Sequence, residues 1–242
     1  MTSAESGGPE AGGLVWFDEP PPPRATPQLS RDRIVAAAIG LADRQPAGEI
    51  TMRALAAELG VRSPMALYRY VGRKDGLADL MADQVYGQIT VPRGDGWRPA
   101  LRGLGRSAWD AVQRHPWFAR LAFSRPPLGP HALSVYDSAL AELEPLGLDA
   151  ATRMGFVSAV FGQVLGSGLA LLEEQAMRAR TGLRTEADLD RAAQPYLDRI
   201  AAAGTYPHFS RWAADPGRHA AAFPAFEQVL DWLLDGLARQ IS

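Results

Sequence analysis

Residues 51–80, TMRALAAELGVRSPMALYRYVGRKDGLADL, decide the fold of this chain. Thr51 is a favourable N-cap residue in front of a run of strong helix formers. Leu55 and Leu59 share one face of the predicted helix because they lie four residues apart. Gly60 ends the helix, since glycine accepts the positive φ angle of a tight helix end.

A second, shorter helix follows after a few residues. Ser63 and Pro64 are suited to its N-cap and first helical position, and it extends to about Tyr70. Two helices that meet at a glycine-containing turn of about 3–4 residues form a helix-turn-helix, whose second helix enters the major groove of DNA. The stretch therefore predicts a DNA-binding head.

The same residues resemble the DNA-binding domain of the tetracycline-repressor (TetR) family of transcriptional regulators. The matching segments are IVAAA (34–38), TMRALA (51–56), LYRY (67–70) and Lys74. Between Gly60 and Leu67 the chain carries one residue more than the usual family spacing, so we expect either a longer turn or a recognition helix that starts differently, which leaves the exact base contacts open. Further along, RHPWFARL (114–121), PPLGP (126–130), GTYPHFSRW (204–212) and FEQVLDWLLDGLAR (226–239) resemble the C-terminal domain of the tetracycline-repressor subgroup.

Nine residues of the head are candidate DNA contacts. By position and by the resemblance, we expect five of them to hold phosphate groups: Thr51, Arg53, Tyr68, Tyr70 and Lys74. The other four are candidates for base edges, where arginine pairs with guanine and methionine touches a thymine methyl group: Arg62, Ser63, Met65 and Arg69. The alternative is that Met65 and Tyr68 pack between helices and that Arg69 is a solvated charge.

Composition limits the other possibilities. The 242 residues include no cysteine, which excludes disulfides, thiolate zinc sites and cysteine nucleophiles. The four histidines are scattered, and no two lie at metal-ligand spacing on one helix. We therefore expect neither a metal site nor a cofactor.

Charge is distributed unevenly in a chain whose net charge is −2. Residues 30–74 contain eight arginines and lysines against four acidic residues, a net charge of +4, so the remainder carries −6. A basic head on an acidic body favours docking of one face on the phosphates of double-stranded DNA.

The chain divides into three parts, and the predicted fold is all-α. Residues 1–28 form a flexible, proline-rich arm, residues 29–90 the helix-turn-helix domain with a linking helix, and residues 91–242 a larger helical domain for effector binding and dimerisation. Helices are expected at 31–44, 74–89, 97–114, 116–124, 131–146, 149–180, 186–203 and 223–241, with a break over 204–224.

The arm allows more than one interpretation. It is an inert tail, or Trp16 and Phe17 dock on the body, or Arg24 reaches into a minor groove as the basic arms of some DNA-binding domains do.

The body has no catalytic motif: it lacks a glycine-rich phosphate loop, GxSxG and HExxH, so we expect no enzymatic activity. It is instead rich in aromatic side chains, as a mostly apolar site for a small-molecule effector requires. The candidate lining consists of Trp109, His115, Phe118, Phe156 and Gln163. The alternative for each aromatic residue is a place in the ordinary core.

A dimer interface is predicted from two helices. Glycine inside a helix costs about 0.5–1 kcal/mol relative to alanine, so Gly155, Gly162 and Gly166 on one face of residues 149–180 indicate the close approach of another helix. The last helix presents a wide apolar face of Phe226, Leu230, Leu233, Leu234 and Leu237. We expect a two-fold four-helix interface, the arrangement of the resembling family; burial of both helices within a monomer is the alternative.

We expect a cytoplasmic location with no membrane contact. The N-terminus lacks the charged-then-apolar order of a signal peptide, and the uncharged residues 154–172 are too weakly apolar for a convincing membrane span.

The leading hypothesis is a homodimeric transcriptional repressor released from a palindromic operator by a small apolar effector. A helical small-molecule-binding protein or enzyme with a vestigial DNA-binding head is the second hypothesis, and an architectural DNA-binding protein is the third.

Overall fold

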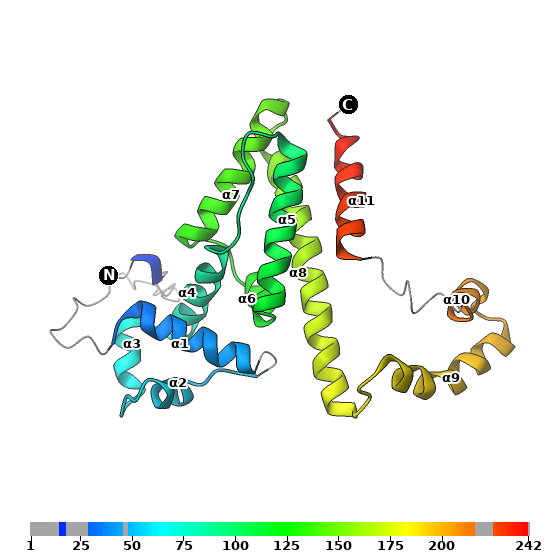
Figure 1. Ribbon diagram of the computed structural model, residues 1–242, viewed down its shortest axis with the longest axis horizontal. Coiled ribbons are helices and arrows are strands. Elements are labelled where there is room, and N and C mark those ends of the chain that lie inside the picture. Colours follow the sequence, from blue (N-terminus) through cyan, green and yellow to red (C-terminus); the bar gives the residue numbers. More distant parts are fainter. Residues whose placement is uncertain (1–14, 18–28, 46–47, 216–224, 242) are drawn as a thin grey trace, which may run out of the picture.

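The computed structural model describes residues 15–17, 29–45, 48–215 and 225–241. In these residues the chain forms α-helices and two short 3₁₀ segments and no strands, which confirms the all-α prediction (Figure 1). The helices are α1 (Arg31–Arg44), α2 (Met52–Glu58), α3 (Met65–Val71), α4 (Lys74–Tyr86), α5 (Trp97–Arg114), α6 (Trp117–Ser124), α7 (Pro130–Leu143), α8 (Ala150–Thr181), α9 (Glu186–Ala203), α10 (Pro207–Ala213) and α11 (Phe226–Ala238).

Helices α1 to α3 form a small head around apolar side chains that the sequence spaces for it. Ile34, Leu55, Leu67 and Val71 are fully buried and bring the three helices together. Arg31 adds a polar connection, because its Nε donates to the carbonyl oxygen of Tyr70 at 2.9 Å. The short helices α2 and α3 are therefore held by packing against α1, since helices of seven residues are too short to be stable alone.

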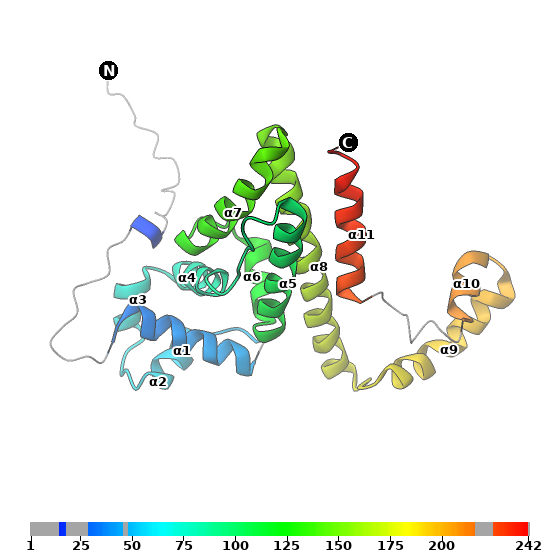
Figure 2. The same cartoon turned by 45° about the horizontal axis from the view of Figure 1, so that its top comes forward.

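The body is built around α8, which packs against α5, α6, α7 and α11. Helix α11 lies antiparallel to α5 along a ladder of three ion pairs: Arg98 with Asp235, Arg102 with Asp231 and Arg106 with Glu227. The ladder follows from matched four-residue steps on the two helices. Between the head and the body lies α4, which contacts α1 and α3 on one side and α6 and α7 on the other (Figure 2).

Helices α9 and α10 project from the end of α8, away from the rest of the body, in both views (Figures 1 and 2). Helix α10 corrects the sequence prediction of a continuous break over residues 204–224. Tyr206 precedes its first residue, Pro207, and proline at the first helical position loses no hydrogen bond. The predicted helix start at residue 223 lies outside the described residues.

Three residues of the predicted N-terminal arm pack against the rest of the chain. Residues Val15–Phe17 form a 3₁₀ turn that contacts α4, and the Val15 side chain is 3% exposed. Gly76 allows this contact: a Cβ atom there would lie 3.2 Å from Val15 Cγ2 and 2.3 Å from the Val71 carbonyl oxygen. The Val15 side chain thus packs directly on the backbone of α4 at Gly76. Arg24 lies outside the described residues.

Among the described residues, one helix, α8, is long enough and apolar enough to cross a membrane, judged by length and composition alone. However, 44% of its most apolar window is buried inside the protein, against four other helices. This burial is typical of the central helix of a helical domain.

Candidate functional site

The helix-turn-helix forms over the predicted residues, but Pro64, and not Ser63, is the N-cap of α3, so this helix begins at Met65, one residue later than predicted. Thr51 caps α2, because its Oγ1 accepts from the amide of Ala54 at 3.1 Å. Gly60 has a φ angle of +68°, and the following amide of Val61 donates to the Ala56 carbonyl oxygen at 2.8 Å. The Thr51 bond thus begins α2, and the turn at Gly60 and Val61 ends it and directs the chain toward α3.

The base-edge candidates lie on the solvent-facing side of α3 and of the turn before it. Met65 is 70% exposed, and Arg62, Ser63 and Arg69 are exposed as well. Ser63 Oγ accepts from the amide of Met65 at 3.3 Å, so this hydroxyl already supports the start of the helix. The structure thus brings all four side chains to one accessible region, and Met65 does not pack between helices.

The phosphate candidates divide into two groups. Thr51, Arg53 and Lys74 are exposed, whereas Tyr68 and Tyr70 are half-buried against the head's core. Their rings therefore contribute to packing as well as offering hydroxyl groups at the surface.

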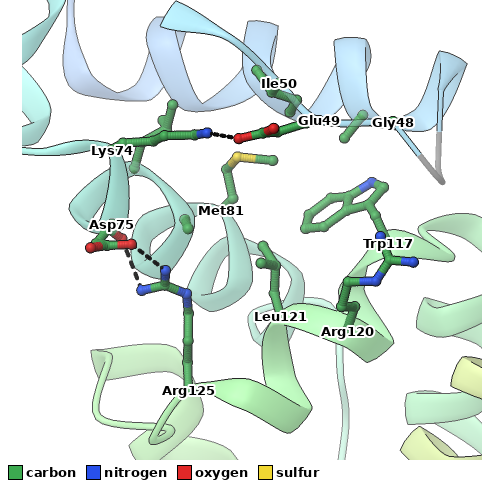
Figure 3. Close-up of a pocket in the computed structure, with 13 residues that line it drawn as sticks. Gly48, Glu49, Ile50, Lys74, Asp75, Met81, Trp117, Arg120, Leu121 and Arg125 are labelled. Carbon is green, nitrogen blue, oxygen red and sulfur yellow. Dashed lines mark hydrogen bonds and ion pairs between the residues drawn. The ribbon is translucent and has the colours of Figure 1, made fainter.

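Lys74 has a partner that sequence reasoning missed. Its Nζ forms an ion pair with a carboxylate oxygen of Glu49 on the segment before α2. The hydrogen bond from Lys74 and its charge hold the pKa of Glu49 below its usual range. The Lys74 ammonium group, which the sequence analysis assigns to a DNA phosphate, is therefore paired with the Glu49 carboxylate in this structure (Figure 3).

Of the five predicted effector-lining residues, Trp109 alone lines the body cleft described below, and two of the others belong to the core. Phe118 is fully buried and meets Tyr86 edge to face with ring centroids 5.1 Å apart. Phe156 is also buried, 6.1 Å from the Trp97 ring. Both phenylalanines are core residues because their helices pack closely at these positions.

The two polar candidates have other partners too. His115 Nδ1 lies 2.8 Å from Asp43 Oδ1, and its Nε2 lies 3.2 Å from Gln88 Nε2. Gln163 Nε2 donates to Ser167 Oγ at 3.1 Å, one turn along its own helix. His115 thus connects the start of the body to Asp43 of the head.

Trp109 is the candidate that lines a cleft in the body. The cleft has a volume of about 310 Å³ between the end of α5 and the middle of α8, and Gln113 and Gln175 supply its polar groups. The Trp109 ring stacks on Phe226 at a centroid distance of 4.5 Å. A mostly apolar cleft with two amides is suited to a small uncharged molecule.

The interface candidates differ by helix. On α8, Gly155, Gly162 and Gly166 are exposed, and a Cβ atom at any of them would meet no described atom within 4 Å. On α11, Leu230 and Leu234 are fully buried within their own chain, which corrects their assignment to a dimer interface. The ion-pair ladder with α5 turns this face of α11 inward, leaving Phe226, Leu233 and Leu237 half-buried at its edges.

Comparison with known proteins identifies the family. A family model described as "Tetracyclin repressor-like, C-terminal domain" matches residues 91–241. The HTH-type transcriptional repressor DrrR1 of Streptomyces coeruleorubidus is 37% identical over 228 residues, covering 93% of this chain and 83% of that protein. The chain belongs to the tetracycline-repressor (TetR) family. The tetracycline repressor class A from transposon 1721 of Escherichia coli is 30% identical over 218 residues, 88% of this chain and 92% of that protein.

Solved TetR-family structures are similar over most of the chain. ActR of Streptomyces coelicolor in complex with actinorhodin is 27% identical with a TM-score of 0.70, covering 88% of this chain and 99% of that one. The class A tetracycline repressor in complex with 5a,6-anhydrotetracycline and magnesium is 26% identical with a TM-score of 0.58, covering 87% and 99%. These similarities confirm the recognition made from sequence, and the chain is a transcriptional regulator of the TetR family.

In this TetR-family chain, α4 is joined to the body by two polar contacts. Asp83 is 5% exposed and accepts from the amide of Ala132 at 2.9 Å and from His131 Nδ1 at 2.8 Å, so it caps the start of α7. Arg125, which follows α6, donates to Asp75 at 2.7 Å and to Asp79 at 2.8 Å. These bonds connect α4 to the segment after α6 and to the start of α7.

The described residues contain no group of three or more histidine, aspartate or glutamate side chains arranged to hold a metal ion.

Proposed function

We propose that this TetR-family regulator is a homodimeric repressor that leaves a palindromic operator when a small, mostly apolar molecule binds in its body. The observation that carries the proposal is the solvent-facing set on α3 and the preceding turn, displayed by a head whose short helices are fixed to α1. Exposed arginines on a short helix after a tight turn serve for reading base edges in the major groove.

Each DNA candidate then has a role. Arg62, Ser63, Met65 and Arg69 contact bases, whereas Thr51, Arg53, Tyr68, Tyr70 and Lys74 hold the phosphates on either side. The heads of two chains bind successive half-sites about one helical turn apart, so the operator is expected to be an inverted repeat.

For the dimer, the open glycine positions of α8 support a helix-to-helix approach between two copies. Gly162 and Gly166 leave space on an otherwise apolar helix, and Trp232 on the neighbouring α11 is 55% exposed. Large aromatic side chains are typical of the centre of an interface, and glycine lets a second helix approach closely. The partner's α8 and α11 would complete a four-helix arrangement.

The projecting α9 and α10 belong to the same proposal. They expose Tyr196, Phe209 and Trp212, each about half accessible in the single chain. Such a group of aromatic residues on one projecting element is costly in water unless another surface covers it. We assign that surface to the partner chain.

The effector site is placed at the cleft beside Trp109, on α5 and α8. Binding there releases DNA only if the effector has different affinities for the operator-bound and free conformations. The regulator acts in the cytoplasm and without catalysis; turnover of a captured effector would instead favour the helical-enzyme hypothesis.

A search of the DNA that flanks the gene for an inverted repeat supplies a candidate operator. Fluorescence anisotropy titrations of that DNA with the protein then test this function. We expect two chains per duplex, a marked loss of affinity on scrambling either half-site, and a steep dependence on salt. Saturation with no sequence preference would refute the repressor and favour the architectural protein.

A further inference from the structure

A second cleft lies outside the body, at the junction of the head and the body. Its volume is about 390 Å³, within the range of about 300–1,000 Å³ that small-molecule sites occupy. It is bounded by the end of α1 and the segment before α2 on the head side, by the first two turns of α4, and by α6 on the body side (Figure 3).

The floor of this junction cleft is apolar. Leu77 and Met81 of α4 and Trp117 of α6 line it with side chains that are otherwise buried, and Leu121 completes it. The Trp117 indole is held in place because its Nε1 donates to Asp43 Oδ1 at 2.7 Å. A fixed indole face beside a thioether favours a flat aromatic molecule.

Polar contacts on both sides hold the cleft open as a defined space. On one side Asp43 of α1 binds Trp117 and His115, and on the other Arg125 binds Asp75 of α4. These contacts lie on opposite sides of the apolar floor.

The rim is cationic. Lys74, Arg120 and Arg125 line the cleft, against the carboxylates of Glu49 and Asp75. Arg125 is committed to two carboxylates and 23% exposed, whereas the Lys74 and Arg120 side chains are 52% and 43% exposed and each has one carboxylate partner. One anionic group on a ligand can therefore exchange with Glu49 on Lys74 or with Glu173 on Arg120.

We propose that the junction cleft is a second small-molecule site, for a planar aromatic molecule that carries one anionic group. The rings lie over Trp117 and Met81, and the anion pairs with Lys74 or Arg120. Because Lys74 is a phosphate contact in the proposed function, an occupant that captures its ammonium group lowers operator affinity. That last step rests on the proposed function, whereas the binding site itself does not.

Anilinonaphthalene sulfonate, two aromatic ring systems with one anionic group, is a suitable probe for the full-length chain. We expect saturable fluorescence enhancement with one molecule per chain. Ala78→Phe, on the α4 wall of the cleft, fills the space and should weaken this binding at least tenfold, whereas Ala141→Phe on exposed α7 should leave it unchanged.

A second variant tests the charge without filling the space. Arg120→Glu should weaken binding of the sulfonate about fivefold, the size of one exposed charge pair, and leave binding of its neutral parent N-phenylnaphthylamine unchanged. Equal binding of the sulfonate to the wild type, Ala78→Phe and Arg120→Glu would overturn the site. If Ala78→Phe proved unstable, equal binding to the wild type and Arg120→Glu would overturn it.

Operator titration then separates the two proposals. Saturating sulfonate should weaken operator binding by the wild type several-fold but not by Ala78→Phe. Binding in the cleft with unchanged operator affinity would overturn the coupling through Lys74 and leave the site standing. A chain that binds the probe in the cleft but no operator DNA would refute the proposed function instead.

Discussion

The head and the body of this regulator carry their functional residues in different ways. In the head, the candidate DNA contacts come from one short stretch, residues 51–74, on α2, α3, the turn between them and the first residue of α4, and all but Tyr68 and Tyr70 are exposed. In the body, the cleft beside Trp109 is formed by side chains from helices far apart in the sequence, such as Trp109 of α5 and Leu172 of α8. Substitutions in the head should therefore act on DNA locally, whereas substitutions in the body act through assembly and through α4.

The largest expected effect comes from the body. Gly162→Leu with Gly166→Leu should leave the single chain folded, because no described atom lies within 4 Å of either Cβ position. The added side chains should nevertheless block the partner's approach, and loss of the second head should weaken operator binding on the order of 10²-fold or more. Light scattering and circular dichroism measure this, and a folded, fully dimeric double variant would show that the glycine face is not the interface.

The next effect tests whether α4 connects the two regions. Asp83→Ala removes a buried carboxylate and leaves the amide of Ala132 without its partner, so the free energy of unfolding should fall by about 3 kcal/mol. Urea unfolding measures the loss, with Asp137→Ala on the exposed side of α7 as the control. Equal stabilities of the two variants would contradict the capping role of Asp83.

The effect of a head substitution on operator binding should be smaller and confined to one base position. Arg69→Gln should cost about 1–3 kcal/mol at a single operator position and leave the preference at other positions intact. Binding to a randomised operator library resolves this, with Arg191→Gln on the projecting α9 as the matched control. A uniform loss over all sequences would make Arg69 a phosphate contact.

The smallest effect concerns Glu49. Glu49→Gln removes the carboxylate that competes with DNA for Lys74, so operator affinity should rise a few-fold and the salt dependence should steepen slightly. The depressed pKa keeps Glu49 ionised, so the gain should be the same between about pH 6 and 8. Glu173→Gln, which frees Arg120 in the body, serves as the control; a loss of affinity in Glu49→Gln would mean that Glu49 positions Lys74 for DNA.

Local signals in the sequence predicted the helices of both regions closely. The expected helices at 31–44, 97–114 and 186–203 have the observed ends, because caps, glycine and proline act within a few residues. The helix expected at 74–89 ends three residues early, at Tyr86. Helix α10 was missed because proline, which the sequence interpretation took for a break, also begins helices.

By itself, then, the sequence determined the helical class, the helix-turn-helix and the exposure of the four candidate base contacts, since these depend on residues close together in the chain and on a polar surface. Only the tertiary structure decided which aromatic residues form the core, that Leu230 and Leu234 face α5 and α8, that Val15 docks on Gly76, and that Glu49 holds Lys74. An apolar residue favours burial against any neighbour, and a charge favours any opposite charge, so such pairings are settled by the packing of distant segments and not by local pattern.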